Sequence, residues 1–201
     1  NSFIKPIVSL AKNNAAQIIK NHLSKKEKYA FAYEELSKKL GIKKIERIDA
    51  FDISHQYMQQ GVGSCVVFAE SGASKKDYRL FNIPNDIAGN DVASMEHVIS
   101  RRLKYYQEQR PDLILIDGGR AQLNFTNKIL NNFGMEKILV LGIAKGKGRV
   151  RATETIYTRK GVIEIDPHSE SFKVLSELRD ESHRFATVSY THLTLPTIYS
   201  V

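Results

Sequence analysis

The chain contains a single cysteine, Cys65, and no apolar stretch long enough to span a bilayer. One cysteine excludes a disulfide framework and a zinc site built from cysteines. Cys65 stands in the apolar run 64–68, where a buried, inert thiol is expected rather than a nucleophile. No secretory signal peptide is recognisable. These absences together predict a protein of the reducing cytoplasm.

Acidic residues are also in short supply, because 22 Asp and Glu face 30 Lys and Arg in 201 residues, for a net charge of +8. Such a balance favours a polyanionic partner, most simply nucleic acid. Residues 1–50 hold eleven Lys and Arg against five Asp and Glu. Much of the basic character therefore belongs to the amino-terminal segment, where a solvated helix face is the equally ordinary explanation.

The amino-terminal segment is predicted to be helical over residues 6–40. Ala, Lys, Glu, Leu and Gln dominate it, and apolar residues recur at roughly helical spacing. Pro6 suits a first helical turn and Gly41 a helix end. The polar stretch 23–26 is the expected break. We therefore predict an accessory helical hairpin, within an extension covering residues 1–44, that leads into the main domain.

From Ile45 the pattern changes to alternating strands and helices. Strands are expected at 45–53, 62–70, 77–83, 112–116, 137–143, 153–158 and 162–165, and helices at 91–109, 120–133 and 169–187. The run Leu113 to Ile116 is apolar on both faces, as in the interior of a covered sheet. This order predicts an α/β domain over residues 45–187, with a mixed β-sheet flanked by helices.

Two acidic residues end apolar, β-prone runs. Asp52 lies near the end of the expected strand 45–53, and Asp117 follows 113–116 and precedes Gly118 and Gly119. An unpaired carboxylate is costly to bury, so one at a strand end usually has a metal, a basic partner or a helix N-terminus beside it. For Asp117, capping of the next helix is the competing explanation.

The last predicted helix adds His183, and the helix from residue 91 adds Asp91. A lone helical histidine is more often structural, and Asp91 is equally well explained as a helix cap. Carboxylates that hold a divalent cation, together with flanking cations, are what phosphodiester hydrolysis requires. Asp52, Asp117 and His183 could supply the first requirement. The cations that could supply the second are Arg101, Arg102, Lys104, Lys145, Lys147 and Arg149.

Seven blocks in order carry a family resemblance: residues 51–55, 64–68, 78–83, 89–95, 111–119, 142–146 and 179–183, the last reading Arg-Asp-Glu-Ser-His. From about Lys5 to Ala186 the chain resembles the carboxyl-terminal half of the UvrC family of excision nucleases. The resemblance implies an RNase H-like nuclease domain. It further implies that Asp52, Asp117 and His183 form the catalytic set, with Asp91 as a further acidic position.

The resemblance also implies what this domain does and what surrounds it. The expected activity is the 5′ incision of nucleotide excision repair, with Mg²⁺ or Mn²⁺ and damaged double-stranded DNA. The expected protein partner is a UvrB-type helicase. The GIY-YIG nuclease domain, the UvrB-docking segment and the helix-hairpin-helix module of the family have no counterpart in this sequence, so a fragment is expected. His183 is expected either to bind the metal or to transfer a proton, and Lys145 to stabilise charge.

Residues 188–201 depart from the family, because they contain no Lys or Arg and are β-prone. We expect them to be an atypical, non-native tail. Two rival functions remain open. One is an endonuclease V-like repair nuclease, and the other is a DNA-binding module without catalysis, in which the carboxylates only cap helices.

Overall fold

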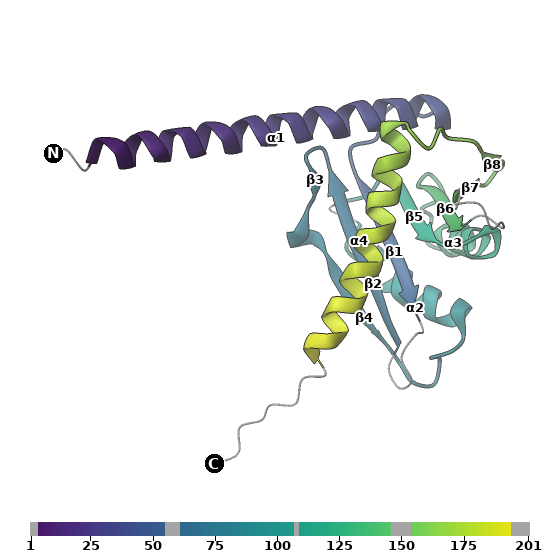
Figure 1. Ribbon diagram of the computed structural model, residues 1–201. Coiled ribbons are helices and arrows are strands. Elements are labelled where there is room, and N and C mark those ends of the chain that lie inside the picture. The colour runs from purple at the N-terminus through teal and green to yellow at the C-terminus, as the bar shows by residue number, and fades with distance from the viewer. Residues whose placement is uncertain (1–3, 55–60, 107–108, 146–153, 194–201) are drawn as a thin grey trace, which may run out of the picture.

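The computed structural model describes residues 4–54, 61–106, 109–145 and 154–193. Its helices are α1 (Ile4–Leu40), α2 (Asp91–Leu103), α3 (Arg120–Asn132) and α4 (Glu170–Leu193), with a 3-10 helix at Lys75–Asp77. Its strands are β1 (Ile48–Ser54), β2 (Gly61–Ala69), β3 (Gly72–Ala73), β4 (Arg79–Ile83), β5 (Leu113–Asp117), β6 (Leu139–Lys145), β7 (Glu154–Thr158) and β8 (Gly161–Ile163). The expected α/β architecture, with a mixed sheet flanked by helices, is confirmed (Figure 1).

The eight strands form one sheet in the order β3-β2-β1-β5-β6-β7-β8, with β4 also paired to β2. β1, β5 and β6 are mutually parallel, and the other pairings are antiparallel. The central position of β5 follows from its sequence, because residues Leu113 to Ile116 are all apolar and all buried.

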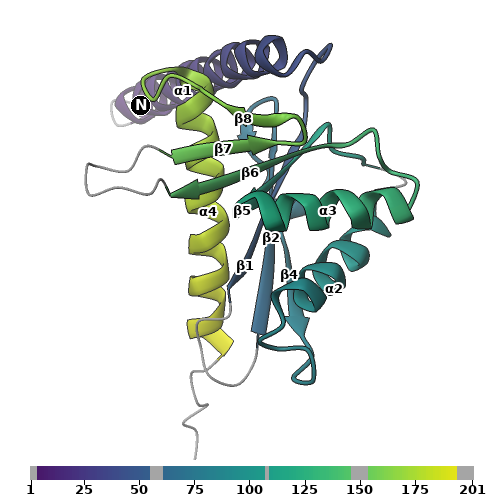
Figure 2. The same cartoon turned by 90° about the vertical axis from the view of Figure 1, so that its right-hand side faces the viewer.

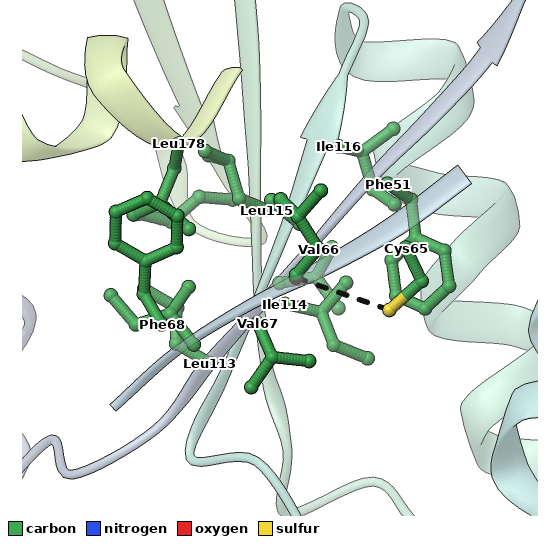
Figure 3. Packing of buried hydrophobic residues seen from close by; sticks show 14 of the residues in the cluster. Phe51, Cys65, Val66, Val67, Phe68, Leu113, Ile114, Leu115, Ile116 and Leu178 are labelled. Atoms are coloured by element: carbon green, nitrogen blue, oxygen red, sulfur yellow. Dashed lines mark hydrogen bonds between the residues drawn. The ribbon is translucent and has the colours of Figure 1, made fainter. Parts of the chain in front are cut away.

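Helices cover the two faces of the sheet unequally. α2 and α3 pack on one face, and α4 crosses the other (Figure 2). The close approach of α2 to β2 depends on Gly63, where a Cβ atom would come within 2.4 Å of Val98. The core between these layers is aliphatic and aromatic (Figure 3). Cys65 lies in it fully buried, and burial raises the pKa of its thiol well above the usual value, as expected for an inert cysteine.

The predicted helical hairpin at the amino terminus is wrong. α1 is a single helix of 37 residues that projects well beyond the sheet (Figure 1). The stretch 23–26 contains neither Gly nor Pro, and its Leu, Ser and Lys residues are tolerated in a helix interior. The last turns of α1 bury Tyr29, Ala32, Tyr33 and Leu36 in the core, so this part of the extension packs as part of the domain.

Element ends differ from the sequence expectations at three further places. α2 stops at Leu103 rather than 109, and turns continue to Tyr106. The strand expected from 77 begins at Arg79, after the 3-10 helix. α4 continues past 187 to Leu193, so residues 188–193 of the atypical tail are helical, and 194–201 lie outside the described residues. Among the described residues, no helix combines the length and apolarity needed to cross a membrane.

Candidate active site

Asp52 and Asp117 lie at the carboxyl ends of neighbouring parallel strands. The register of β1 and β5 pairs Phe51 with Ile116, and its continuation by one residue places Asp52 beside Asp117. Register partners point to the same side of a sheet, so the two carboxylates share a face. The side chain of Asp52 is 7% exposed, whereas Asp117 is exposed. The sequence prediction that these two residues meet is consistent with this register.

The turn after Asp117 is built for close packing. The N–H of Gly118 donates to the carbonyl of Ile143 on β6 at 2.9 Å. A Cβ atom on Gly142 would come within 2.7 Å of the Gly118 carbonyl oxygen, so this approach requires glycine at 142. α3 is capped by Gly119, whose N–H donates to the Gln122 side chain. The N-cap residue of α3 is thus Gly119 rather than Asp117.

His183 joins the carboxylates from the helix that crosses their face. Its Nδ1 lies 3.1 Å from Oδ2 of Asp52, and its side chain is 53% exposed. Ser64 is the partner of Asp52 on β2, and its hydroxyl donates to the carbonyl of Ser182 at 2.9 Å. This bond ties the turn of α4 that carries His183 to the sheet next to Asp52.

The electrostatics of Asp52 reflect both neighbours. Burial is the main influence and raises the pKa of this carboxyl above its usual value. The charge of His183 acts in the opposite direction, and the nearby charge of Asp117 raises the pKa further. A buried carboxyl beside a second carboxylate and an imidazole is the arrangement in which perturbed pKa values mark functional sites.

The structure does not place Asp91 on the sheet face that carries Asp52, Asp117 and His183. It is the first residue of α2, and the cap of that helix is Asn90, whose side chain accepts from the N–H groups of Val92 and Ala93. Because Asn90 is the cap, Asp91 belongs to the first turn of α2. α2 covers the sheet face opposite α4, and the expected catalytic contribution of Asp91 stays a prediction.

The expected DNA-binding cations fall into four groups. Arg102 does not fit: it is 3% exposed, and its guanidinium binds the buried Asp49. Arg101 and Lys104 are exposed, but at the end of α2, on the face opposite His183. Lys145 ends β6, near the end of the sheet that carries Asp117. Lys147 and Arg149 lie outside the described residues.

Sequence reasoning missed Glu154 and Arg179 near the site. Glu154 is the register partner of Lys145, and its carboxylate binds Arg179 and the hydroxyl of Ser176, both on α4. Arg179 precedes His183 by one helical turn. The block that contains Arg179 was recognised, but its partner on β7 follows the loop 146–153 and had no motif to reveal it.

The donor set fits a hard cation such as Mg²⁺, which is usually held by one or two carboxylates, waters and substrate phosphates. Asp52 and Asp117 are of this kind. Among the described residues, no group of three or more His, Cys, Asp and Glu side chains lies close enough to enclose a metal ion. His183 is in contact with one carboxylate of the pair, and whether it ligates a metal stays a prediction.

Fold and site together define an RNase H-like nuclease domain, with paired carboxylates at parallel strand ends and a histidine on the covering helix. The family model described as "UvrC RNAse H endonuclease domain" matches residues 37–187, which is most of the chain. The chain belongs to this family.

Curated relatives agree with this assignment. UvrABC system protein C of Saccharophagus degradans is 39% identical over 190 residues, covering 91% of this chain and 31% of that protein. The protein of the same description in Acinetobacter baumannii is 37% identical over 184 residues, covering 91% and 30%. The chain therefore spans about a third of the length of these relatives.

Solved structures with a similar arrangement are endonucleases V. The crystal structure of human endonuclease V covers 73% of this chain and 86% of its own, with a TM-score of 0.44 and 11% identity. Endonuclease V of Ciona intestinalis, in complex with DNA containing an inosine, covers 89% and 98%, with a TM-score of 0.48 and 10% identity. Likeness at this level carries no information about the substrate of this chain.

Proposed function

We propose that this chain is a metal-dependent endonuclease domain that makes the 5′ incision in nucleotide excision repair. The observation that carries the proposal is the site itself: Asp52 and Asp117 side by side at strand ends, with His183 at 3.1 Å from Asp52. Membership of the UvrC endonuclease domain family supports the same activity.

The residues of the chain would divide the work as follows. Asp52 and Asp117 hold Mg²⁺ or Mn²⁺, which when bound polarises the scissile phosphate and lowers the pKa of the attacking water. His183 is oriented by its Nδ1 contact with Asp52 and by the Ser64–Ser182 bond. An Nδ1–H donated to Asp52 leaves Nε2 as the atom that accepts a proton. Lys145 adds positive charge next to the site.

The partners follow from the activity. The substrate is damaged double-stranded DNA, positioned through contacts of Lys and Arg side chains with its phosphates. A UvrB-type helicase would present the lesion, and the relatives named UvrABC system protein C support that partner. We also propose that the protein acts in the cytoplasm.

The decisive experiment is nicking of a labelled, pre-nicked lesion duplex loaded with the UvrB-type partner, with Mn²⁺ or with EDTA. We expect metal-dependent cutting on the 5′ side of the lesion. The variant Asp117→Ala should lose at least two orders of magnitude in rate, because it loses half of the cation site. The matched control is Asp86→Asn, an exposed aspartate in the loop before α2.

Each outcome separates the candidates. Equal rates for Asp117→Ala and the unchanged chain would overturn the assignment of Asp117. Cutting of inosine-containing DNA by the chain alone would favour the endonuclease V-like activity. Salt-sensitive DNA binding without any metal-dependent cutting would favour the non-catalytic module.

A further inference from the structure

A pocket of about 510 Å³ lies at the end of the sheet away from the carboxylates. It is formed by the end of α1, the start of β6 and the β7–β8 hairpin, which lie near one another in both views (Figures 1 and 2). Leu139, at its edge, pairs with Leu113 at the start of β5, whereas Asp117 pairs with Ile143. The lining of the pocket on β6 extends to Leu141, so two residues of strand, or about 7 Å, separate it from the row of Asp117.

The rim of this pocket is basic. Lys38 and Lys39 come from the last turn of α1, and Arg159 and Lys160 from the β7–β8 turn. Lys38 pairs with Glu34, but Lys39, Arg159 and Lys160 are exposed and form no ion pair with a described carboxylate. Glu136 is the one acidic residue among the described lining residues. An anionic ligand therefore fits the rim.

The floor of the pocket is aliphatic. Leu40, Ile42, Leu139 and Ile163 line it, and each is only partly buried against the core. A volume of this size lies within the range of small-molecule sites, which combine an apolar lining with a few charged groups. A suitable ligand is thus anionic at one side and apolar at the other.

We propose that this pocket binds a nucleotide unit of single-stranded nucleic acid, with phosphates on the rim and the base and sugar on the floor. Duplex DNA exposes its phosphates but keeps its bases stacked inside, so it could reach the rim but not fill the recess. A single strand can turn a base outward onto a protein surface. The site lies outside the proposed catalytic centre, and binding to it is measured without cutting.

The test is binding of the intact chain to a labelled oligo-dT and to a duplex of equal length, in EDTA, over a range of salt. The double variant Arg159→Gln/Lys160→Gln removes two rim charges. Two lost phosphate contacts should make the slope of log K against log salt shallower by about 1.4 for the single strand. The matched control, Lys75→Gln/Lys76→Gln, removes two exposed charges near the other edge of the sheet.

The floor is tested with an abasic strand of the same length and charge. We expect the unchanged chain to prefer oligo-dT by about fivefold, as for burial of ~40 Å² of apolar surface. Leu40→Gln, which retains a good helix former at the end of α1, should abolish that preference while leaving the salt slope unchanged. Circular dichroism checks that each variant is folded.

Three results would overturn the proposal. One is an equal change of slope for the rim variant and its control. Another is an equal loss of affinity for the duplex and the single strand, which would mean a general phosphate-binding surface. The third is binding of the abasic strand as tightly as oligo-dT. None of these results bears on whether Asp52 and Asp117 support cutting, so the two proposals fail separately.

Discussion

β1 carries two aspartates three residues apart, and the two faces of the sheet treat them differently. Asp49 faces α2 and is completely buried. Its carboxylate accepts from Arg47 at 2.9 Å, from two nitrogens of Arg102 at 2.9 and 3.0 Å, and from the Tyr106 hydroxyl at 2.9 Å. Burial and the charge of Asp49 raise the pKa of Tyr106 well above its usual value, which keeps this hydroxyl a donor.

Asp52 faces α4 with a much poorer set of partners. It has one imidazole at 3.1 Å, and its neighbour Asp117 carries charge of the same sign. A carboxylate surrounded by cations and donors anchors a helix, whereas one beside a second carboxylate is available for a cation or a proton. The comparison teaches that burial alone does not separate a structural aspartate from a functional one, but its partners do.

The largest effect is expected from Asp49→Ala. This variant leaves Arg102 buried at 3% exposure without its main partner, which should lower the free energy of unfolding by about 3–5 kcal/mol. Urea denaturation at pH 7 measures it. The double variant Asp49→Leu/Arg102→Met removes both charges and should recover much of the loss. A loss below 1 kcal/mol in the single variant would mean that this cluster does not anchor α2.

Asp52→Asn should change the free energy of unfolding in the opposite direction, toward greater stability. Because the folded-state pKa of Asp52 is raised, ionisation of this residue opposes folding at neutral pH. The amide should therefore stabilise the protein by about 0.5–2 kcal/mol at pH 7, while cutting is lost. The gain should appear as the pH rises through the folded pKa and vanish below the ordinary pKa of about 3.9. Thermal unfolding across pH 3–8 measures it, and a destabilised variant at pH 7 would contradict the expected sign.

The sequence was informative where local pattern and function agree. The run Leu113 to Ile116 predicted an interior strand, and it is the centre of the sheet. The acids at the ends of two such runs were expected to share a cation site, and the parallel register of β1 and β5 is consistent with it, while their catalytic role stays a prediction. The family resemblance of residues 179–183 assigned His183 to the site, and in the structure its Nδ1 lies 3.1 Å from Oδ2 of Asp52.

The sequence was uninformative where a contact joins distant segments. In the sequence Arg102 stands beside Arg101 and Lys104, and nothing local distinguishes it from these two exposed cations. Only the fold shows that Arg102 lies on the side of α2 that faces Asp49 on β1. α1 has no local signal that distinguishes a bent helix from a straight one, and packing of Tyr29 and Leu36 in the core fixes its last turns. Glu154 and Arg179 are 25 positions apart, and no spacing rule relates a strand to a crossing helix.

The smallest effect, and the sharpest test of the comparison, is a matched pair of single hydroxyl deletions. Ser64→Ala removes the bond to Ser182 on the α4 face, and Tyr106→Phe removes a bond to Asp49 on the α2 face. Each should lower the free energy of unfolding by about 1 kcal/mol. Only Ser64→Ala loosens the turn that carries His183, so its nicking rate should fall several-fold at unchanged substrate affinity, while that of Tyr106→Phe stays near the parental value. Equal rates in the two variants would mean that the Ser64 bond supports the fold without positioning His183.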